Sequence, residues 1–325
     1  MVLLPLLAAS ALAASPAPPP TRAPHAVPVV FATVVLTPYQ ERAAALLVES
    51  IRTFGGEFNQ APIYVAVDNP DTLPCTGSRE RGARVIRLEL DEAARAYPFA
   101  AKVYAAAQVE RMVATAARTL VWLDAETLVL APPTDLDLDG PQVVAARPVF
   151  LLNTVGLPVD QPVDHFWSAI YEAAGADPAA VPAVVSLVED VAIRLYINCG
   201  IIAFRPGRGI CREWAKTFGA LASDEAFQRS ACADARHRIF LHQAVLSAVV
   251  AARTRPAERR WLPPGYVYPL HLHNRLPIEK RAHRLNDLTC MIVESLWEEA
   301  AGVSRVMPVE EPLRSWLLGR QMDPP

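Results

Sequence analysis

The 325-residue sequence lacks several features that would place it in a functional class at once. It has no excess of basic residues, because 31 Lys and Arg are set against 34 Asp and Glu, so a nucleic-acid binder that relies on bulk positive charge is not expected. No uninterrupted apolar run reaches the roughly 18 residues of a membrane span. The five cysteines are widely spaced and form no CxxC pair, which argues against a structural zinc site. What remains is an ordinary globular composition with 52% hydrophobic residues, which excludes a mostly disordered chain.

Glycine is scarce, with 14 residues against 30 prolines. Many of these prolines lie in residues 15–28, where they remove backbone donors and fix φ, so we predict an extended linker. Residues 1–14 are apolar and end in small residues, as in a secretory signal peptide, although no Lys or Arg precedes the apolar run. Residues 1–14 fit a signal peptide, an Ala/Pro-rich tail or an artefact of an upstream start codon. The localisation, secretory or cytoplasmic, is therefore left open, and the fold is expected to begin near Val29.

From Val29 onward, apolar runs alternate with segments of helical periodicity. Residues 29–36, VVFATVVL, are typical of a strand buried on both faces, and a helix is expected at 40–54. The later elements predicted by the same patterns are strands at 63–67, 84–90, 120–123, 127–130, 142–147 and 195–204, and helices at 99–117, 212–221 and 239–251. This order predicts an α/β fold with a largely parallel sheet.

Two acids, Asp124 and Glu126, directly follow the strand expected at 120–123. The carboxyl ends of parallel strands line the crevice in which α/β sheets bind ligands. Carboxylates two residues apart at such an end can face Mg²⁺ or Mn²⁺, which in turn can hold a diphosphate. A β-turn whose acids only cap loop amides is the alternative, and a short acidic motif does not decide between them.

The segment TLVWLDAETLVLAPP, residues 119–133, resembles the DxD region of GT-A nucleotide-sugar glycosyltransferases, especially their family-8 (glycogenin-like) group. Other segments resemble that family in the same order, namely VVLTPY at 34–39, FAAK at 99–102, INCGIIAFRP at 197–206 and LHQAVL at 241–246. The resemblance covers roughly residues 29–275. It implies a GT-A, Rossmann-like mixed and mostly parallel sheet flanked by helices, and we expect residues 276–325 to form a helical C-terminal tail.

The resemblance also implies a reaction and a site. The reaction is transfer of a hexose from a nucleoside-diphosphate sugar, most readily a UDP-sugar, to a hydroxyl of a glycan, lipid or protein acceptor, with retention and with Mn²⁺ or Mg²⁺. The residues implied for the metal are Asp124, Glu126 and His271, and the two acids would also hold the diphosphate. Lys102 would meet the diphosphate or a sugar hydroxyl, and Thr37 and Tyr39 the base and ribose. The residues implied for catalysis are Asp124, Asn198 and Gln243.

Departures from the family pattern keep other functions open. Glu126 and His242 each stand where the family usually has Asp. The segment of His271 and His273 lacks the Gly and the Lys-Pro-Trp that accompany the family's metal-binding histidine. Because it is expected to be strand-like, these two histidines should point to opposite faces, so only one can be a ligand. A nucleotide- or sugar-binding protein that kept the fold but lost the chemistry is the main alternative. A nucleotidyltransferase ranks third, because residues 36–39 offer neither Gly nor Lys.

Overall fold

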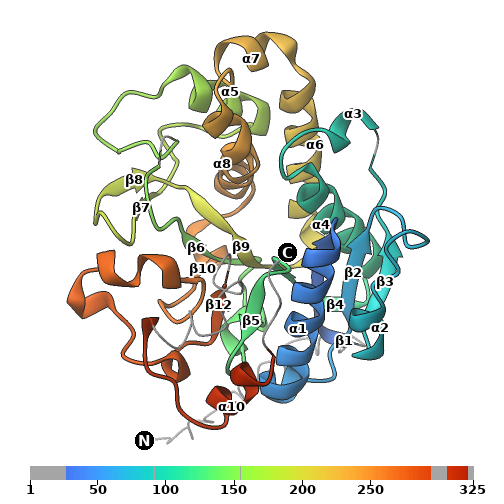
Figure 1. Ribbon diagram of the computed structural model, residues 1–325. Helices are drawn as coiled ribbons and strands as arrows, with labels where there is room; N and C mark the ends of the chain where they lie inside the picture. The colour runs from blue at the N-terminus through green and yellow to red at the C-terminus, as the bar shows by residue number, and fades with distance from the viewer. Residues whose placement is uncertain (1–26, 91, 154, 294–305, 321–325) are drawn as a thin grey trace, which may run out of the picture.

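The computed structural model describes residues 27–90, 92–153, 155–293 and 306–320. The predicted signal peptide and all of the predicted linker up to residue 26 lie outside this part of the chain. A seven-stranded sheet runs through the centre in the order β10-β6-β9-β4-β1-β2-β3 (Figure 1). Its strands are β1 (Val27–Val35), β2 (Ile63–Val67), β3 (Arg84–Arg87), β4 (Ala117–Leu123), β6 (Val144–Pro148), β9 (Ile197–Phe204) and β10 (Arg259–Trp261).

All neighbouring strands of this sheet run parallel except β9, which is antiparallel to both β4 and β6. The sheet is therefore mixed and mostly parallel, as predicted. In β1, Val30 and Ala32 face one hydrophobic cluster, while Val29 and Phe31 face another. This two-sided burial explains why the strand is a continuous apolar run rather than an alternating one.

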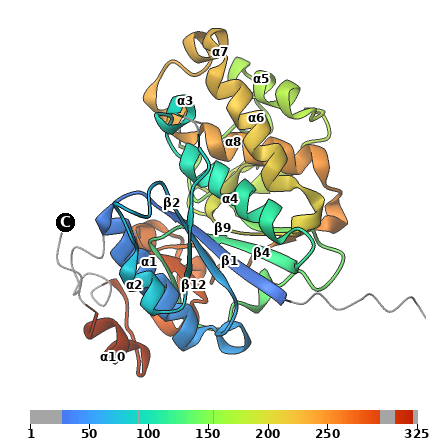
Figure 2. The same cartoon turned by 90° about the vertical axis from the view of Figure 1, so that its right-hand side faces the viewer.

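Helices cover both faces of the sheet (Figure 2). One layer is built around α4 (Ala100–Val113), α6 (Ile210–Ser223) and α8 (Ala235–Arg253), and the opposite layer around α1 (Pro38–Phe54) and α2 (Thr76–Glu80). The smaller helices are α3 (Glu92–Arg95), α5 (His165–Ala174) and α7 (Glu225–Ser230), with 3₁₀ turns η1 (Gly56–Phe58), η2 (Thr134–Leu136), η3 (Pro206–Arg208) and η4 (Pro256–Glu258). Strands β7 (Ala183–Val185) and β8 (Ala192–Arg194) form a separate antiparallel pair.

The expectation of a helical C-terminal tail is wrong for most of the part that the structure describes. Residues 276–293 contain the 3₁₀ turns η6 (Ile278–Lys280) and η7 (Leu285–Asp287) and then strand β12 (Cys290–Ile292), while residues 294–305 lie outside the description. Strand β12 joins β11 (Tyr268–Pro269) and β5 (Thr127–Val129) in a three-stranded sheet. Its antiparallel pairing with β5 satisfies backbone groups that a helix would satisfy internally, and no local pattern reveals this distant partner.

The final described helix, α10 (Leu313–Leu318), packs against the core. The Trp316 ring meets the Phe54 ring of α1 edge to face, with centroids 5.4 Å apart. Among the described helices, none has the length and apolar character that would be needed to cross a bilayer. All five cysteines are buried free thiols.

Candidate functional site

A cavity of about 460 Å³ opens where the C-terminal end of β4 meets the beginning of β9. Its wall brings together six side chains that the sequence singled out: Lys102, Asp124, Glu126, Asn198, Gln243 and His271. They come from α4, the β4–β5 turn, β9, α8 and the 3₁₀ helix η5 (Leu270–Arg275). The carboxyl end of a parallel strand is where an α/β sheet is expected to offer a ligand site.

Asp124 is fixed from two sides. Its Oδ2 lies 2.7 Å from Lys102 Nζ, and the indole N–H of Trp122 donates to its Oδ1 at 3.0 Å. The Asp124 N–H donates to the carbonyl oxygen of Gly200 at 2.8 Å, which anchors the turn to β9. The Asp124 side chain keeps 28% of its surface exposed, so it faces the cavity while it is held in one orientation.

Lys102 is unusual because its charged side chain is almost fully buried, with 6% of the residue exposed. Besides Asp124, its ammonium group contacts the carbonyl oxygen of Cys199 at 3.5 Å. A buried ammonium is tolerated when it has such partners, and removing one of them is costly. Lys102 therefore supplies a fixed positive charge to the cavity wall.

Asn198 and Gln243 both brace the start of β9. The carboxamide oxygen of Asn198 accepts from the N–H of Gly200 at 2.8 Å. The Gln243 oxygen accepts from the Cys199 N–H at 3.0 Å, and its amide nitrogen donates to the Tyr196 hydroxyl at 3.1 Å. Gln243 is buried rather than on an exposed helix face. Its carboxamide therefore lines the cavity and also holds the backbone at the start of β9 in place.

Glu126 and His271 line the same cavity as Asp124, but the three do not form a metal centre in this arrangement. Across the residues that the structure describes, no three His, Cys, Asp or Glu side chains gather into a group that could hold a metal ion. Both Asp124 oxygens already accept hydrogen bonds, and His271 is exposed on η5. The assignment of Asp124, Glu126 and His271 to a metal ion therefore stays a prediction.

The sequence predicted that the segment around His271 is strand-like, and this prediction is wrong. Residues 270–275 form η5, a 3₁₀ helix, because Pro269 ends the short strand β11 just before it. His271 lines the cavity, whereas His273 lies next to the Tyr268 hydroxyl, with Nδ1 2.8 Å from that oxygen. The two histidines therefore do separate, although through a helical turn.

Thr37 and Tyr39 do not belong to the side chains that line this cavity. Thr37 caps α1, since its hydroxyl accepts from the Gln40 N–H at 3.2 Å. Tyr39 is half-buried in the first turn of α1, beneath the guanidinium of Arg42. Both follow β1, the parallel neighbour of β4, so they lie at the same edge of the sheet as Asp124.

Sequence reasoning missed several of the side chains that complete the wall, among them Phe99, Phe150, Asn153 and Phe240. Phe99 was read only as part of the segment carrying Lys102, and His242 only as a departure from the family pattern. In the structure, the Phe99 and His242 rings stack with centroids 4.4 Å apart. The sequence could predict that Phe99 lies near Lys102, because both belong to the start of one helix. It could not predict that this helix start contacts α8, which carries His242.

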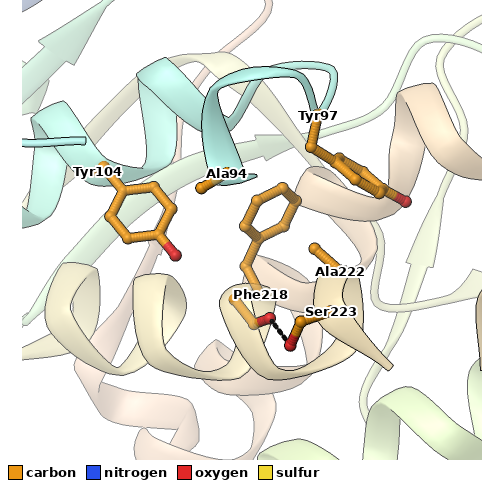
Figure 3. A pocket seen from close by; sticks show the side chains of 7 residues that line it. Ala94, Tyr97, Tyr104, Phe218, Ala222 and Ser223 are labelled. Atoms are coloured by element: carbon orange, nitrogen blue, oxygen red, sulfur yellow. Dashed lines mark hydrogen bonds between the residues drawn. The ribbon is translucent and has the colours of Figure 1, made fainter. Parts of the chain in front are cut away.

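A second pocket, of about 320 Å³, lies between α4 and α6 (Figure 3). Tyr97, Tyr104 and Phe218 point into it, and the Ser223 hydroxyl donates to the Gly219 carbonyl at its edge. The side chains that line it include no acid, no lysine, no arginine and no histidine. The first cavity is the candidate functional site because it gathers the side chains that the sequence singled out at the carboxyl end of β4.

Comparisons with known proteins identify the family of the chain. A family model described as the Rhodobacterales glycosyltransferase domain matches residues 31–254, which is more than half of the chain. No curated protein matches the sequence.

Two solved structures illustrate the likeness in three dimensions. The galactosyltransferase LgtC, solved with donor and acceptor sugar analogs, is 11% identical, and the alignment covers 91% of this chain and 97% of that chain with a TM-score of 0.50. The glycosyltransferase GlyE of Streptococcus pneumoniae TIGR4 is 12% identical over 91% of this chain and 61% of its own, with a TM-score of 0.49. At such identities the likeness to LgtC shows the fold alone, which is the predicted GT-A fold.

Proposed function

Because this chain belongs to the Rhodobacterales glycosyltransferase domain family, we propose that it transfers a hexose from a nucleoside-diphosphate sugar to an acceptor hydroxyl. A UDP-sugar is the first donor to consider, and a glycan, a lipid or a protein is the acceptor. One observation carries the proposal: the buried Lys102 ammonium, held 2.7 Å from Asp124, lines a cavity at the carboxyl end of β4 that also carries Glu126 and Asn198.

The chemistry of this pair suits a leaving diphosphate. As the bond between the sugar and the diphosphate breaks, negative charge grows on the departing oxygen. A cation that is already oriented stabilises that charge without reorganisation, which is the general basis of electrostatic catalysis. Asp124 holds the Lys102 ammonium in place, and the low exposure of Lys102 limits screening by water.

The remaining polar groups would position the sugar and the acceptor. The amide of Asn198 lies on the cavity wall, next to the turn that carries Asp124. Gln243 keeps the first residues of β9 in register through Cys199 and Tyr196. Retention of configuration is the stereochemistry we propose from the family-8 resemblance.

Resemblance and geometry disagree about the metal. The family-8 likeness favours Mn²⁺ or Mg²⁺, whereas Asp124, Glu126 and His271 do not gather into a metal-binding group. The steps above are written for the Lys102 ammonium, and none of them is routed through a metal ion. Glu126 and His242, which replace the family's usual Asp, favour the second candidate function, a protein that binds a nucleotide sugar without turning it over.

The test begins with binding. Thermal stabilisation of the purified protein is measured with UDP and GDP, each with Mn²⁺, with Mg²⁺ and with a chelator. Donor turnover is then followed as hydrolysis across a panel of nucleotide sugars, with Asp124→Ala as the inactive control and His165→Phe, on the separate helix α5, as the matched active one. We expect stabilisation and slow hydrolysis that Asp124→Ala removes. Stabilisation without turnover would establish the binding protein instead, and no stabilisation by any nucleoside diphosphate would refute both.

A further inference from the structure

One wall of the cavity carries a histidine that the proposed reaction has not yet used. His242 lines the cavity from α8 and is 3% exposed. Its Nδ1 lies 2.8 Å from the backbone carbonyl oxygen of Ile239. Because a carbonyl oxygen can only accept a hydrogen bond, Nδ1 must carry the hydrogen.

The surroundings of His242 favour its neutral imidazole. Burial, and next the nearby Lys102 ammonium, hold the pKa of His242 well below its ordinary value. A neutral ring with its hydrogen on Nδ1 leaves Nε2 as an acceptor. No N–H or O–H of the described chain donates to this nitrogen.

Phe99 holds this ring in position. The two rings stack with centroids 4.4 Å apart and planes 22° from parallel. Phe99 also has a backbone φ of 60°, in the left-handed region that a bulky residue rarely adopts. Such a conformation is strained and persists where the surroundings impose it, often at a binding site. Here it places the aromatic ring against His242 at the start of α4.

We propose that Nε2 of His242 accepts a hydrogen bond from a hydroxyl group of the substrate sugar, and that Phe99 is the positioning residue for this acceptor. The inference rests on the proposed function, since it requires a sugar in the cavity. Its location favours the transferred sugar. The Lys102 ammonium reaches Asp124 and also lies over the Phe99 ring, 5.1 Å from the centroid. The diphosphate site proposed at Lys102 therefore adjoins the part of the cavity wall formed by Phe99 and His242.

The experiment compares a nucleoside diphosphate with its sugar conjugate. Affinities of UDP, UDP-glucose and UDP-galactose, and of GDP and GDP-mannose as a second set, are measured by calorimetry for the wild type and four variants. His242→Phe keeps the stack on Phe99 and removes the acceptor, whereas His242→Gln restores an acceptor oxygen near the position of Nε2. Phe99→Gly relieves the left-handed strain while it removes the stack. His165→Phe is the matched control.

We expect His242→Phe to lower the affinity for the sugar nucleotide about tenfold, which corresponds to one hydrogen bond lost in a buried site. The affinity for the bare diphosphate should not change. His242→Gln should recover part of this loss, and Phe99→Gly should show a similar sugar-selective loss without a lower unfolding temperature. If donor affinity is unchanged but the KM for the acceptor rises, the hydroxyl that His242 binds belongs to the acceptor sugar.

Equal losses for the diphosphate and the sugar nucleotide would overturn the inference while leaving the transferase intact, and so would no change in any substrate constant. A wild type that binds neither the diphosphates nor their sugars would instead refute the proposed function. The two failures are therefore distinguishable.

Discussion

The pairing of Lys102 with Asp124 makes the sharpest quantitative prediction. Asp124→Asn removes the negative charge but keeps the shape, and leaves a buried ammonium, 6% exposed, beside a neutral amide. Breaking a buried ion pair from one side typically costs about 3–5 kcal/mol. Because the Asp124 side chain keeps 28% of its surface exposed, water can partly replace it, and we expect the lower end, about 3 kcal/mol, for the single variant.

Lys102→Met tests the same contact from the other side, since methionine fills a similar volume without a charge. If the two groups act as a pair, the double variant should cost less than the sum of the single variants, with a coupling of about 2 kcal/mol. Unfolding in urea gives each free energy, provided that the slope with denaturant is unchanged. Activity should fall for both single variants and should not return in the double variant, because its charges are gone. Strictly additive stabilities would refute the reasoning that Asp124 stabilises the lysine.

Three further predictions concern the wall and the pH dependence. In Gly200→Ala the new Cβ would lie 2.2 Å from the Cδ1 atom of Ile292, the end of a half-buried side chain that can turn aside, so we expect a loss of only about 1 kcal/mol in urea unfolding and weaker donor binding; unchanged stability would contradict this contact. Gln243→Leu leaves a buried N–H and a tyrosine hydroxyl without their partner, and should lower the free energy of unfolding by about 1–3 kcal/mol; a wild-type value would contradict the bracing role. Hydrogen bonds from Arg208, first among several, lower the pKa of Glu258 to about 2, so its contribution to stability is present above about pH 4.5 and lost as the pH falls toward 2. Glu258→Gln should flatten that part of the curve of unfolding free energy against pH, and an unaltered acid limb would argue against the ion pair.

The sheet was predictable from the sequence because its strands are short apolar runs buried on both faces. The strand at 63–67 is predicted to the residue, and Asp124 lies just after β4, as the pattern indicates. Lys102 lies in the first turn of α4 and Asn198 at the start of β9, and the order and direction of the strands bring both to the end of β4. Whether they act as proposed is a matter for the experiments above.

What the sequence could not predict depends on partners far along the chain. Residues 290–292 form a strand only because β5, about 160 residues earlier, offers an edge in the register that pairs Met291 with Leu128. The left-handed conformation of Phe99 has no sequence signal, since such positions favour glycine. The burial of Gln243 depends on Cys199 and Tyr196, which belong to a different element.

The reversed direction of β9 explains why these distant groups meet at one cavity. A strand parallel to β4 would bring its last residues to the carboxyl end of β4, but the antiparallel β9 brings its first ones, and Leu123 pairs with Ile201. Asn198 and Gly200 therefore lie beside Asp124, and the Asp124 N–H closes the ladder on the Gly200 carbonyl. A slip of one residue would exchange the faces of Asn198 and Cys199, burying an amide and turning a thiol toward the cavity. The hydrogen bonds of Gln243 and Asn198 to the first residues of β9 oppose that slip, so residues with no charge of their own help to hold the charged pair at the cavity.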